Sequence, residues 1–233
     1  MLAHMNAQSP YNFADPALVT GYPQQAARAV PGYHDVHTMT SVLLAERAPE
    51  GARVLVLGAG GGLETKALAT AHPDWTFLAV DPSAAMLDLA MTTLGALASR
   101  MTVHEGLVDD APEGPFDAAT ALLLLHLLDR EERLNTLADV HRRLRPGAPL
   151  VVMHVSYPQA DPAERELWLG RHEAYLVASG VEAAHVEKAC TMLRLHMPAL
   201  NPDEDRAVLE EAGFTGVTQF FSALTFRGWI GYA

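Results

Sequence analysis

Strand-like and helix-like segments alternate along the chain between residues 33 and 156, and this alternation limits the fold more than any other feature. Five short apolar runs have the length and composition of buried strands. They are residues 53–58, 75–80, 101–106, 116–124 and 149–157. The stretches between them carry apolar residues at helical spacing. Because such an order is typical of a parallel sheet covered on both faces, we expect a doubly wound α/β protein.

Capping residues predict where the helices begin and end. In the segment 129–145, Asp129 is a suitable N-cap, Glu132 completes a capping box, and Pro146-Gly147 ends the helix. Before the first strand, residues 33–48 place Val36, Met39, Val42 and Leu43 on one predicted helical face.

The pattern changes after the fifth strand. Residues 158–200 contain two helical stretches that end near Pro198, and we expect them to form an inserted cap. Asn201 then offers an N-cap for a further helix, and two aromatic-rich runs at the end of the chain predict a hairpin. The expected fold is an α/β, Rossmann-like, doubly wound sheet of about seven strands, mostly parallel with an antiparallel C-terminal edge, plus the helical cap insertion. Residues 1–32 are expected to form an N-terminal arm, and 33–233 the main domain.

Charge and composition exclude several classes of partner. The chain has 16 Lys and Arg against 28 Asp and Glu, a net charge of −12, which disfavours a surface that tracks nucleic-acid phosphates. No apolar run approaches the ~18 residues that would span a bilayer, and no signal-peptide pattern is present. The single Cys190 cannot form an internal disulfide. We therefore expect a cytoplasmic protein that binds neither nucleic acid nor membrane.

The clearest chemical signal is the glycine-rich loop that follows the first strand, in VLVLGAGGGLETKALA (54–69). Glycines allow the backbone to turn tightly and to approach a ligand, while the first N–H groups of the next helix face it. The dinucleotide fingerprint would need glycine where Leu63 stands, and the phosphate-binding lysine of a P-loop is replaced by Glu64-Thr65. A nicotinamide cofactor or a nucleoside triphosphate is therefore not the first expectation.

Asp81 ends the second strand, about 20 residues beyond the glycine loop, where a carboxylate commonly accepts the ribose hydroxyls of a nucleotide. The alternative is that Asp81 only caps the helix that starts after Pro82. We favour the ribose role, because a glycine loop and a strand-end acid together mark the crevice at the carboxyl ends of the strands.

Four segments in order resemble the successive motifs of class I S-adenosylmethionine-dependent methyltransferases. They are VLVLGAGGG (54–62), VDPSAAML (80–87), FDAATALLLLHLL (116–128) and RRLRPGAPLVV (142–152). The resemblance implies S-adenosylmethionine as cofactor. It places Gly58, Ala59 and Gly60 under the methionine part, Asp81 and the adjoining Pro82 at the ribose, and Leu107 and Val108 beside the adenine.

A narrower resemblance, carried by AVPGYHDVHTMTSVLLAER (29–47), LEEAGF (209–214) and the aromatic end of the chain, is to the carboxy-S-adenosylmethionine synthase branch and related small-molecule methyltransferases. It nominates Tyr33 as a cofactor contact. That branch has an arginine where this chain has Val208, with Arg206 two residues earlier, so we expect ordinary S-adenosylmethionine and methyl transfer.

Two acids that are usual in the broader family are missing, because Val56 and Leu107 occupy their positions. A carboxylate that binds the cofactor's amino group or adenine contributes on the order of 1.5–3 kcal/mol. Asp109 and Asp110 are close enough in sequence to compensate for Leu107, whereas nothing obvious compensates for Val56.

Proton removal from the acceptor has several candidate bases, and we rank His154 and Tyr157 first because they end the fifth strand beside the expected crevice. His126, His172 and His196 are weaker candidates. No metal is expected, since no pair of ligands at metal-binding spacing occurs. The apolar residues of the cap are open to three interpretations: internal packing, a lid over an apolar acceptor, or a homodimer surface.

The expected function is methyl transfer from S-adenosylmethionine to a small-molecule acceptor. A carboxy-S-adenosylmethionine synthase-like enzyme is one alternative. A catalytically degenerate protein that only binds S-adenosylmethionine is another, and a nicotinamide-dependent oxidoreductase ranks last. The sequence does not specify the acceptor, because family motifs do not encode the shape of the substrate pocket.

Overall fold

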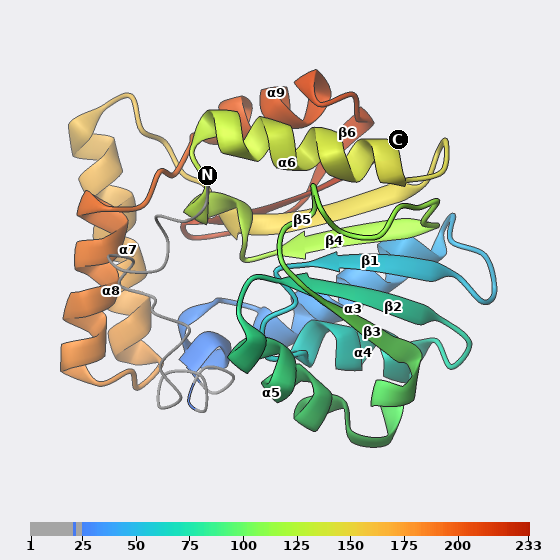
Figure 1. The fold of residues 1–233 in the computed structure, drawn as a ribbon. Coiled ribbons are helices and arrows are strands. Elements are labelled where there is room, and N and C mark those ends of the chain that lie inside the picture. Colours follow the sequence, from blue (N-terminus) through green and yellow to red (C-terminus); the bar gives the residue numbers. More distant parts are fainter. Residues whose placement is uncertain (1–20, 22–24) are drawn as a thin grey trace.

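A computed structural model describes Gly21 and residues 25–233, which build a seven-stranded sheet with helices on both faces (Figure 1). The strands are β1 (Arg53–Leu57), β2 (Thr76–Asp81), β3 (Met101–Glu105), β4 (Ala118–Leu122), β5 (Pro149–Val155), β6 (Thr215–Ala223) and β7 (Phe226–Tyr232). Their order is β3-β2-β1-β4-β5-β7-β6. The first five are parallel, and β7 runs antiparallel to both β5 and β6. The predicted fold class is confirmed.

The helices form two layers with a separate pair at one end of the sheet (Figure 1). One layer contains α3 (Tyr33–Ala45), α4 (Leu63–Ala71) and α5 (Ala84–Leu94), and the other contains α6 (Arg130–Arg143) and α9 (Pro202–Glu211). Two short 3-10 helices, η2 (Gly95–Arg100) and η3 (Leu125–Leu127), complete the connections. The predicted capping boxes at Asp129 and Asn201 are both present. Within the described part of the chain, no helix has the length and apolar character to cross a bilayer.

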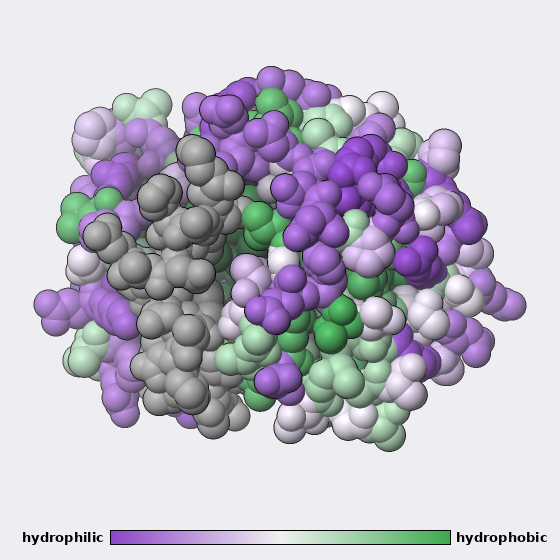
Figure 2. Space-filling model, in the orientation of Figure 1, coloured by the Kyte–Doolittle hydropathy of each residue, from purple (hydrophilic) through white to green (hydrophobic). Residues whose placement is uncertain are grey.

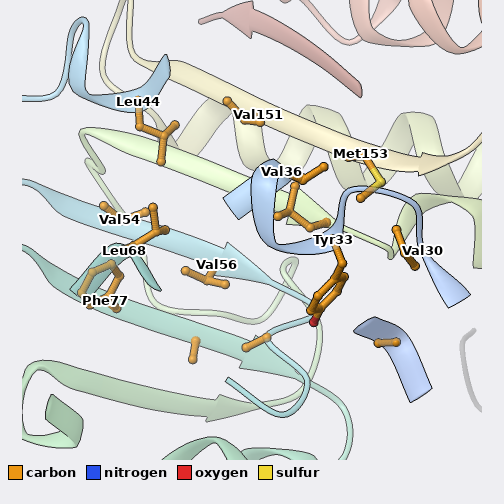
Figure 3. Close-up of a cluster of buried hydrophobic side chains, with 14 of the residues drawn as sticks. Val30, Tyr33, Val36, Leu44, Val54, Val56, Leu68, Phe77, Val151 and Met153 are labelled. Carbon is orange, nitrogen blue, oxygen red and sulfur yellow. The ribbon is translucent and has the colours of Figure 1, made fainter. Parts of the chain in front are cut away.

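The alternation of side chains along β1 divides the core between the two helical layers. Val54 and Val56 point toward α3 and α4, as Figure 3 shows, whereas Leu55 and Leu57 pack toward α6. All four side chains are buried. Four consecutive buried apolar residues in one strand are typical of a parallel sheet that is covered on both faces.

The prediction for α3 needs one correction. Its buried side includes Val36, Thr40 and Leu44, but Val42 is 61% exposed. Residues 36, 40 and 44 are spaced by four, close to one helical turn, whereas residue 42 is half a turn away from both of its buried neighbours. Helical geometry, rather than apolar character, therefore decides which side of α3 is buried.

Residues 158–200 form α7 (Pro162–Ala178) and α8 (Ala183–Leu195), which lie beyond the carboxyl ends of the parallel strands (Figure 1). Leu176, Val186 and Cys190 pack between the two helices, while Leu169 and Leu193 join the main core. The predicted N-terminal arm lies largely outside the described residues. Of its last part, residues 25–29 are helical.

Candidate functional site

A pocket opens at the carboxyl ends of β1, β4 and β5, on the side of the sheet covered by α3 and α4. It encloses about 430 Å³ of empty space, counting its open mouth. Its lining consists of Tyr33, His37, Gly58, Ala59, Gly60, Gly61, Gly62, Leu63, Glu64, Leu122, Leu123 and Met153. The glycine loop that the sequence predicts as a ligand site thus forms one wall of the pocket.

The glycines of this loop are required by its backbone. Gly58 and Gly62 have φ values of +59° and +77°, in the left-handed region that other residues rarely adopt. A Cβ atom on Gly62 would lie 2.7 Å from the Cα atom of Ala90 in α5. Gly62 is also the N-cap of α4, so the unpaired N–H groups of that helix begin beside the pocket.

Asp81 fixes the glycine loop from the neighbouring strand. Its Oδ2 atom accepts a hydrogen bond from the Gly60 N–H at 2.9 Å, and its Oδ1 atom accepts one from the Ser83 N–H at 2.9 Å. Burial raises the pKa of this carboxyl, and the two backbone hydrogen bonds oppose the rise. Ser83, rather than Asp81, caps α5 by accepting from the Met86 N–H. Asp81 is therefore not the N-cap of α5, and the capping alternative is wrong.

Leu107 and Val108 occupy the loop after β3, outside the pocket lining. The loop passes next to β2, because the Gly106 N–H donates to the Asp81 carbonyl at 3.2 Å. Val108 is buried in the core on the α6 side. Pro82 directly follows Asp81 at the end of β2. Asp81, Pro82, Leu107 and Val108 therefore all lie at or just beyond the carboxyl ends of β2 and β3, next to the glycine loop after β1.

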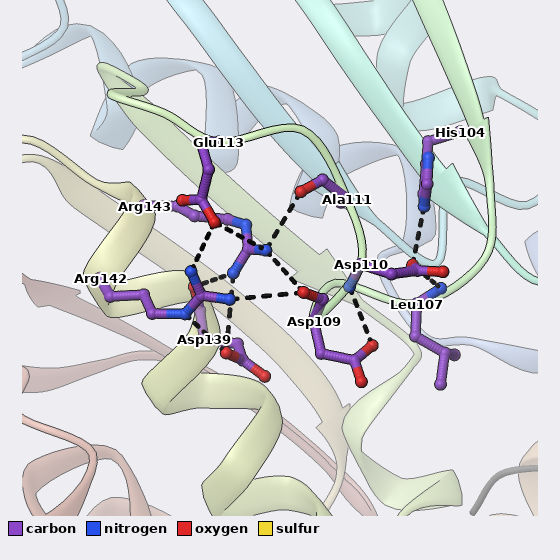
Figure 4. A network of polar contacts seen from close by, with 9 residues as sticks. All are labelled: His104, Leu107, Asp109, Asp110, Ala111, Glu113, Asp139, Arg142 and Arg143. Atoms are coloured by element: carbon purple, nitrogen blue, oxygen red, sulfur yellow. Dashed lines mark hydrogen bonds and ion pairs between the residues drawn. The ribbon is translucent and has the colours of Figure 1, made fainter.

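A polar network holds the loop after β3 against α6 (Figure 4). Asp110 accepts from the Leu107 N–H at 3.1 Å and contacts His104 at 2.8 Å. Arg143 donates to the carbonyl of Asp109 at 3.0 Å. Hydrophilic side chains gather over α6 on the face shown in Figure 2, where Arg142 bridges Glu113 and Asp139. Asp109 and Asp110 thus have structural partners in this network.

His154 lies on the other side of the sheet from the pocket. Side chains alternate along β5, so Met153 lines the pocket while His154 faces α9. Its Nε2 atom is 3.0 Å from Asp205 Oδ1, an ion-pair distance without hydrogen-bond geometry. Asp205 also pairs with the buried Arg133 of α6. His154 therefore belongs to a buried polar cluster that joins β5, α6 and α9.

Tyr157 lies on the pocket side of the sheet but outside the pocket lining. It is fully buried and belongs to the same apolar cluster as Leu169 and Leu193 of the two helices beyond the strands. Tyr33, in contrast, lines the pocket directly, and its ring meets that of His37 edge to face at a centroid distance of 4.7 Å. Burial lowers the pKa of His37 to about 4, so its imidazole is neutral at pH 7.

The sequence interpretation missed Glu64 as a pocket residue. It stands in the first turn of α4, is 7% exposed, and lines the pocket beside the glycines. Burial raises the pKa of its carboxyl to about 7, partly opposed by the Thr120 hydroxyl. The available signal was its spacing: Glu64, Thr65 and Leu68 occupy the buried side of α4, so an acid there faces the sheet.

Among the described residues, no three or more His, Cys, Asp or Glu side chains are arranged to hold a metal ion. The arrangement at the strand ends is instead suited to a zwitterionic or nucleoside-containing molecule. It combines backbone N–H groups at a helix start, two buried carboxyl groups and apolar walls.

Comparisons with known proteins agree with this geometry. Residues 54–147 match the family described as Methyltransferase domain. The carboxy-S-adenosyl-L-methionine synthase of Chromohalobacter salexigens is 29% identical over 228 residues, covering 95% of this chain and 83% of that protein. The synthase of Actinobacillus succinogenes is 27% identical over 210 residues, covering 88% and 86%.

Two solved structures share the fold at low sequence identity. A candidate O-methyltransferase from Nostoc punctiforme has a TM-score of 0.70 at 18% identity, covering 97% of this chain and 62% of that one. Human N-acetylserotonin methyltransferase in complex with S-adenosylmethionine has a TM-score of 0.67 at 14% identity, covering 97% and 59%. The chain thus spans less than two thirds of either structure. The matched domain, which contains the glycine loop after β1, and the similarity to the two synthases together support a class I S-adenosylmethionine-dependent methyltransferase.

Proposed function

We propose that this methyltransferase transfers the methyl group of S-adenosylmethionine to a small-molecule acceptor. The observation that carries the proposal is the pocket at the strand ends, where the glycine loop is tied to the Asp81 carboxylate. Ligands of doubly wound sheets bind at this edge. The cofactor supplies an electrophilic methyl group, and the protein must hold the acceptor in line with it.

The residues at this edge suit the cofactor. Gly58, Ala59 and Gly60 lack bulky side chains and form the floor for its methionine part. Both Asp81 oxygens accept one backbone N–H each, and a carboxylate oxygen can accept a second hydrogen bond, here from a ribose hydroxyl. Pro82, Leu107 and Val108 continue this edge toward the adenine, and Tyr33 closes the pocket from α3.

The acceptor side is assigned to the cap formed by α7 and α8. These helices stand beyond the strand ends and contribute Leu169 and Leu193 to the same core as Tyr157. A cap in this position favours an enclosed small molecule, and the net charge of −12 disfavours a nucleic-acid acceptor. The expected cytoplasmic location and homodimer stay predictions.

Alignment of a reactive acceptor provides most of the rate in a methyl transfer, so a protein base is not obligatory. His154 is not assigned this role, because it lies on the α9 side of β5 with Asp205. Tyr157 stays the better candidate of the two, since it lies on the pocket side.

Calorimetric titration with S-adenosylmethionine, S-adenosylhomocysteine and NADH tests the proposal. We expect saturable heats from the first two, and saturable binding of NADH alone would overturn it. Asp81→Ala should weaken S-adenosylhomocysteine by about tenfold or more, because the variant loses a charged acceptor for ribose. Methyl loss should then be measured against a panel of thiols, phenols and amines.

A second candidate is the activity named for the synthase relatives, which the 29% identity over nearly the whole chain favours. Against it, Val208 is fully buried in the core beside α6, and Arg206 is exposed and paired with Glu210 at 2.9 Å. No Lys or Arg lines the pocket in the described part of the chain. Mass spectrometry after incubation with S-adenosylmethionine and candidate carboxyl donors distinguishes the two, because only a synthase yields a carboxylated cofactor.

A further inference from the structure

Glu64 is a buried acid that faces the pocket without a matching cation. The residue is only 7% exposed, and its Oε1 atom has no hydrogen-bond partner among the described residues. Burying an acid in this way is costly unless the carboxyl is protonated or a ligand pairs with it. The position of Glu64 beside the glycine loop makes a ligand the natural partner.

Glu64 lies next to the strand position from which the usual family acid is missing. Val56 occupies that position, and its side chain points into the apolar cluster on the α4 side (Figure 3). Val56 pairs with Thr120 of the neighbouring strand β4. The Thr120 hydroxyl lowers the pKa of the Glu64 carboxyl, which places the two side chains close together. The carboxyl on α4 therefore reaches the same side of the sheet that an acid at residue 56 would have faced.

The charges around the pocket are suited to the amino-acid end of the cofactor. The glycine loop and the start of α4 offer N–H groups to a carboxylate. Apart from Glu64, the ionisable side chains of the pocket lining are Tyr33 and His37, both on α3, and the lowered pKa of His37 leaves its imidazole neutral at pH 7. An α-ammonium group bound there would find Glu64 as its anionic partner.

We propose that Glu64 accepts a hydrogen bond from the α-ammonium group of S-adenosylmethionine and so replaces the carboxylate that is absent at Val56. This proposal rests on the proposed function, because it assumes that the pocket binds this cofactor. The interaction joins an anionic acceptor to a cationic donor, the stronger class of hydrogen bond.

The ionisation of Glu64 provides a measurable consequence. Without ligand, burial holds the pKa of this carboxyl at about 7, so a large fraction is protonated at pH 6.5. A bound ammonium group favours the ionised form and lowers the pKa. Cofactor binding at pH 6.5 should therefore release a proton from Glu64 to the buffer.

The experiment compares S-adenosylhomocysteine with 5′-methylthioadenosine, which has the same nucleoside and sulfur but no amino-acid group. We expect Glu64→Gln to weaken S-adenosylhomocysteine by about tenfold or more and 5′-methylthioadenosine by less than about twofold. Asp81→Ala should weaken both ligands, because both contain the ribose. Titrations in buffers of different ionisation enthalpy should show proton release with the wild type and its loss in Glu64→Gln.

The outcomes separate the two proposals. If the wild type binds neither S-adenosylmethionine nor S-adenosylhomocysteine, the proposed function fails. If the wild type binds them, but Glu64→Gln affects both probe ligands equally or leaves both unchanged, the assignment of Glu64 is overturned. Misfolding is checked independently: removal of a buried acid should leave the urea midpoint of the unliganded variant equal to or above that of the wild type at pH 8.

Discussion

His172 provides a quantitative test of how the cap is attached to the sheet domain. This α7 residue is 4% exposed, and its Nδ1 atom lies 3.3 Å from the Thr225 hydroxyl. Its ring stands 5.6 Å from that of Phe226 at the start of β7. Burial lowers the pKa of the imidazole from 6.5 to about 4. Protonation at mildly acidic pH is therefore favoured in the unfolded chain and disfavoured in the folded one.

The sign and size of the effect follow from these two pKa values. Between pH 4 and 6.5 the unfolded state binds more protons at this site, so the stability due to neutral His172 is present above pH 6.5 and declines on acidification. At pH 5 the loss from this one residue is about 2 kcal/mol relative to pH 7. His172→Gln keeps a side chain that can meet Thr225 but removes the titration.

Urea unfolding followed by circular dichroism at pH 7 and pH 5 measures the difference. Wild-type stability should fall on acidification, and the fall in His172→Gln should be smaller by about 2 kcal/mol. His185→Gln, an exposed site on α8, is the matched control and should match the wild type. Equal acid sensitivity of the His172 variant and the wild type would refute a buried neutral imidazole at this junction.

Two further pairs of substitutions, each a test with its control, probe the packing around the sheet. Asp205→Asn removes the buried carboxylate that pairs with Arg133, and we expect a loss of about 3–5 kcal/mol in urea unfolding. Arg206→Ala, which breaks an exposed pair on the same helix, should cost under about 1 kcal/mol, and equal losses would contradict the role of burial. A non-glycine residue in the left-handed conformation costs ~1–2 kcal/mol. Gly62→Ala should reduce the free energy of unfolding by more than this, since its methyl group would also press on the backbone of α5. Gly51→Ala, where nothing lies within 4 Å of the added atom, measures the backbone part alone in the same assay.

Local signals in the sequence were sufficient for the elements and their order. The capping boxes at Asp129 and Asn201 form as predicted, because each depends on residues within one turn of a helix. The runs of apolar residues likewise predicted the strands within a few residues. Gly58 ends β1 because its positive φ is incompatible with continued extended backbone.

The site was only partly predictable. The sequence indicated the glycine loop and Asp81, which are marked by residue type and spacing, and the structure joins them through the Gly60 N–H. It did not indicate that His154 faces away from the pocket. Side chains alternate between the two faces of β5, and the sequence does not say which face carries the pocket. Nor did it indicate Glu64, whose importance depends on a strand more than fifty residues away in the chain.

By itself, then, the sequence determined the alternating α/β order, the helix ends, the glycine loop and the resemblance to methyltransferases, because each is encoded in residues that are near neighbours. Only the tertiary structure decided which side chains share the pocket. Thr120 and Glu64 meet because β4 pairs with β1 and α4 packs on that side of the sheet. Long-range packing also set the pKa of Glu64, because burial depends on every element that surrounds a group and not on its own segment.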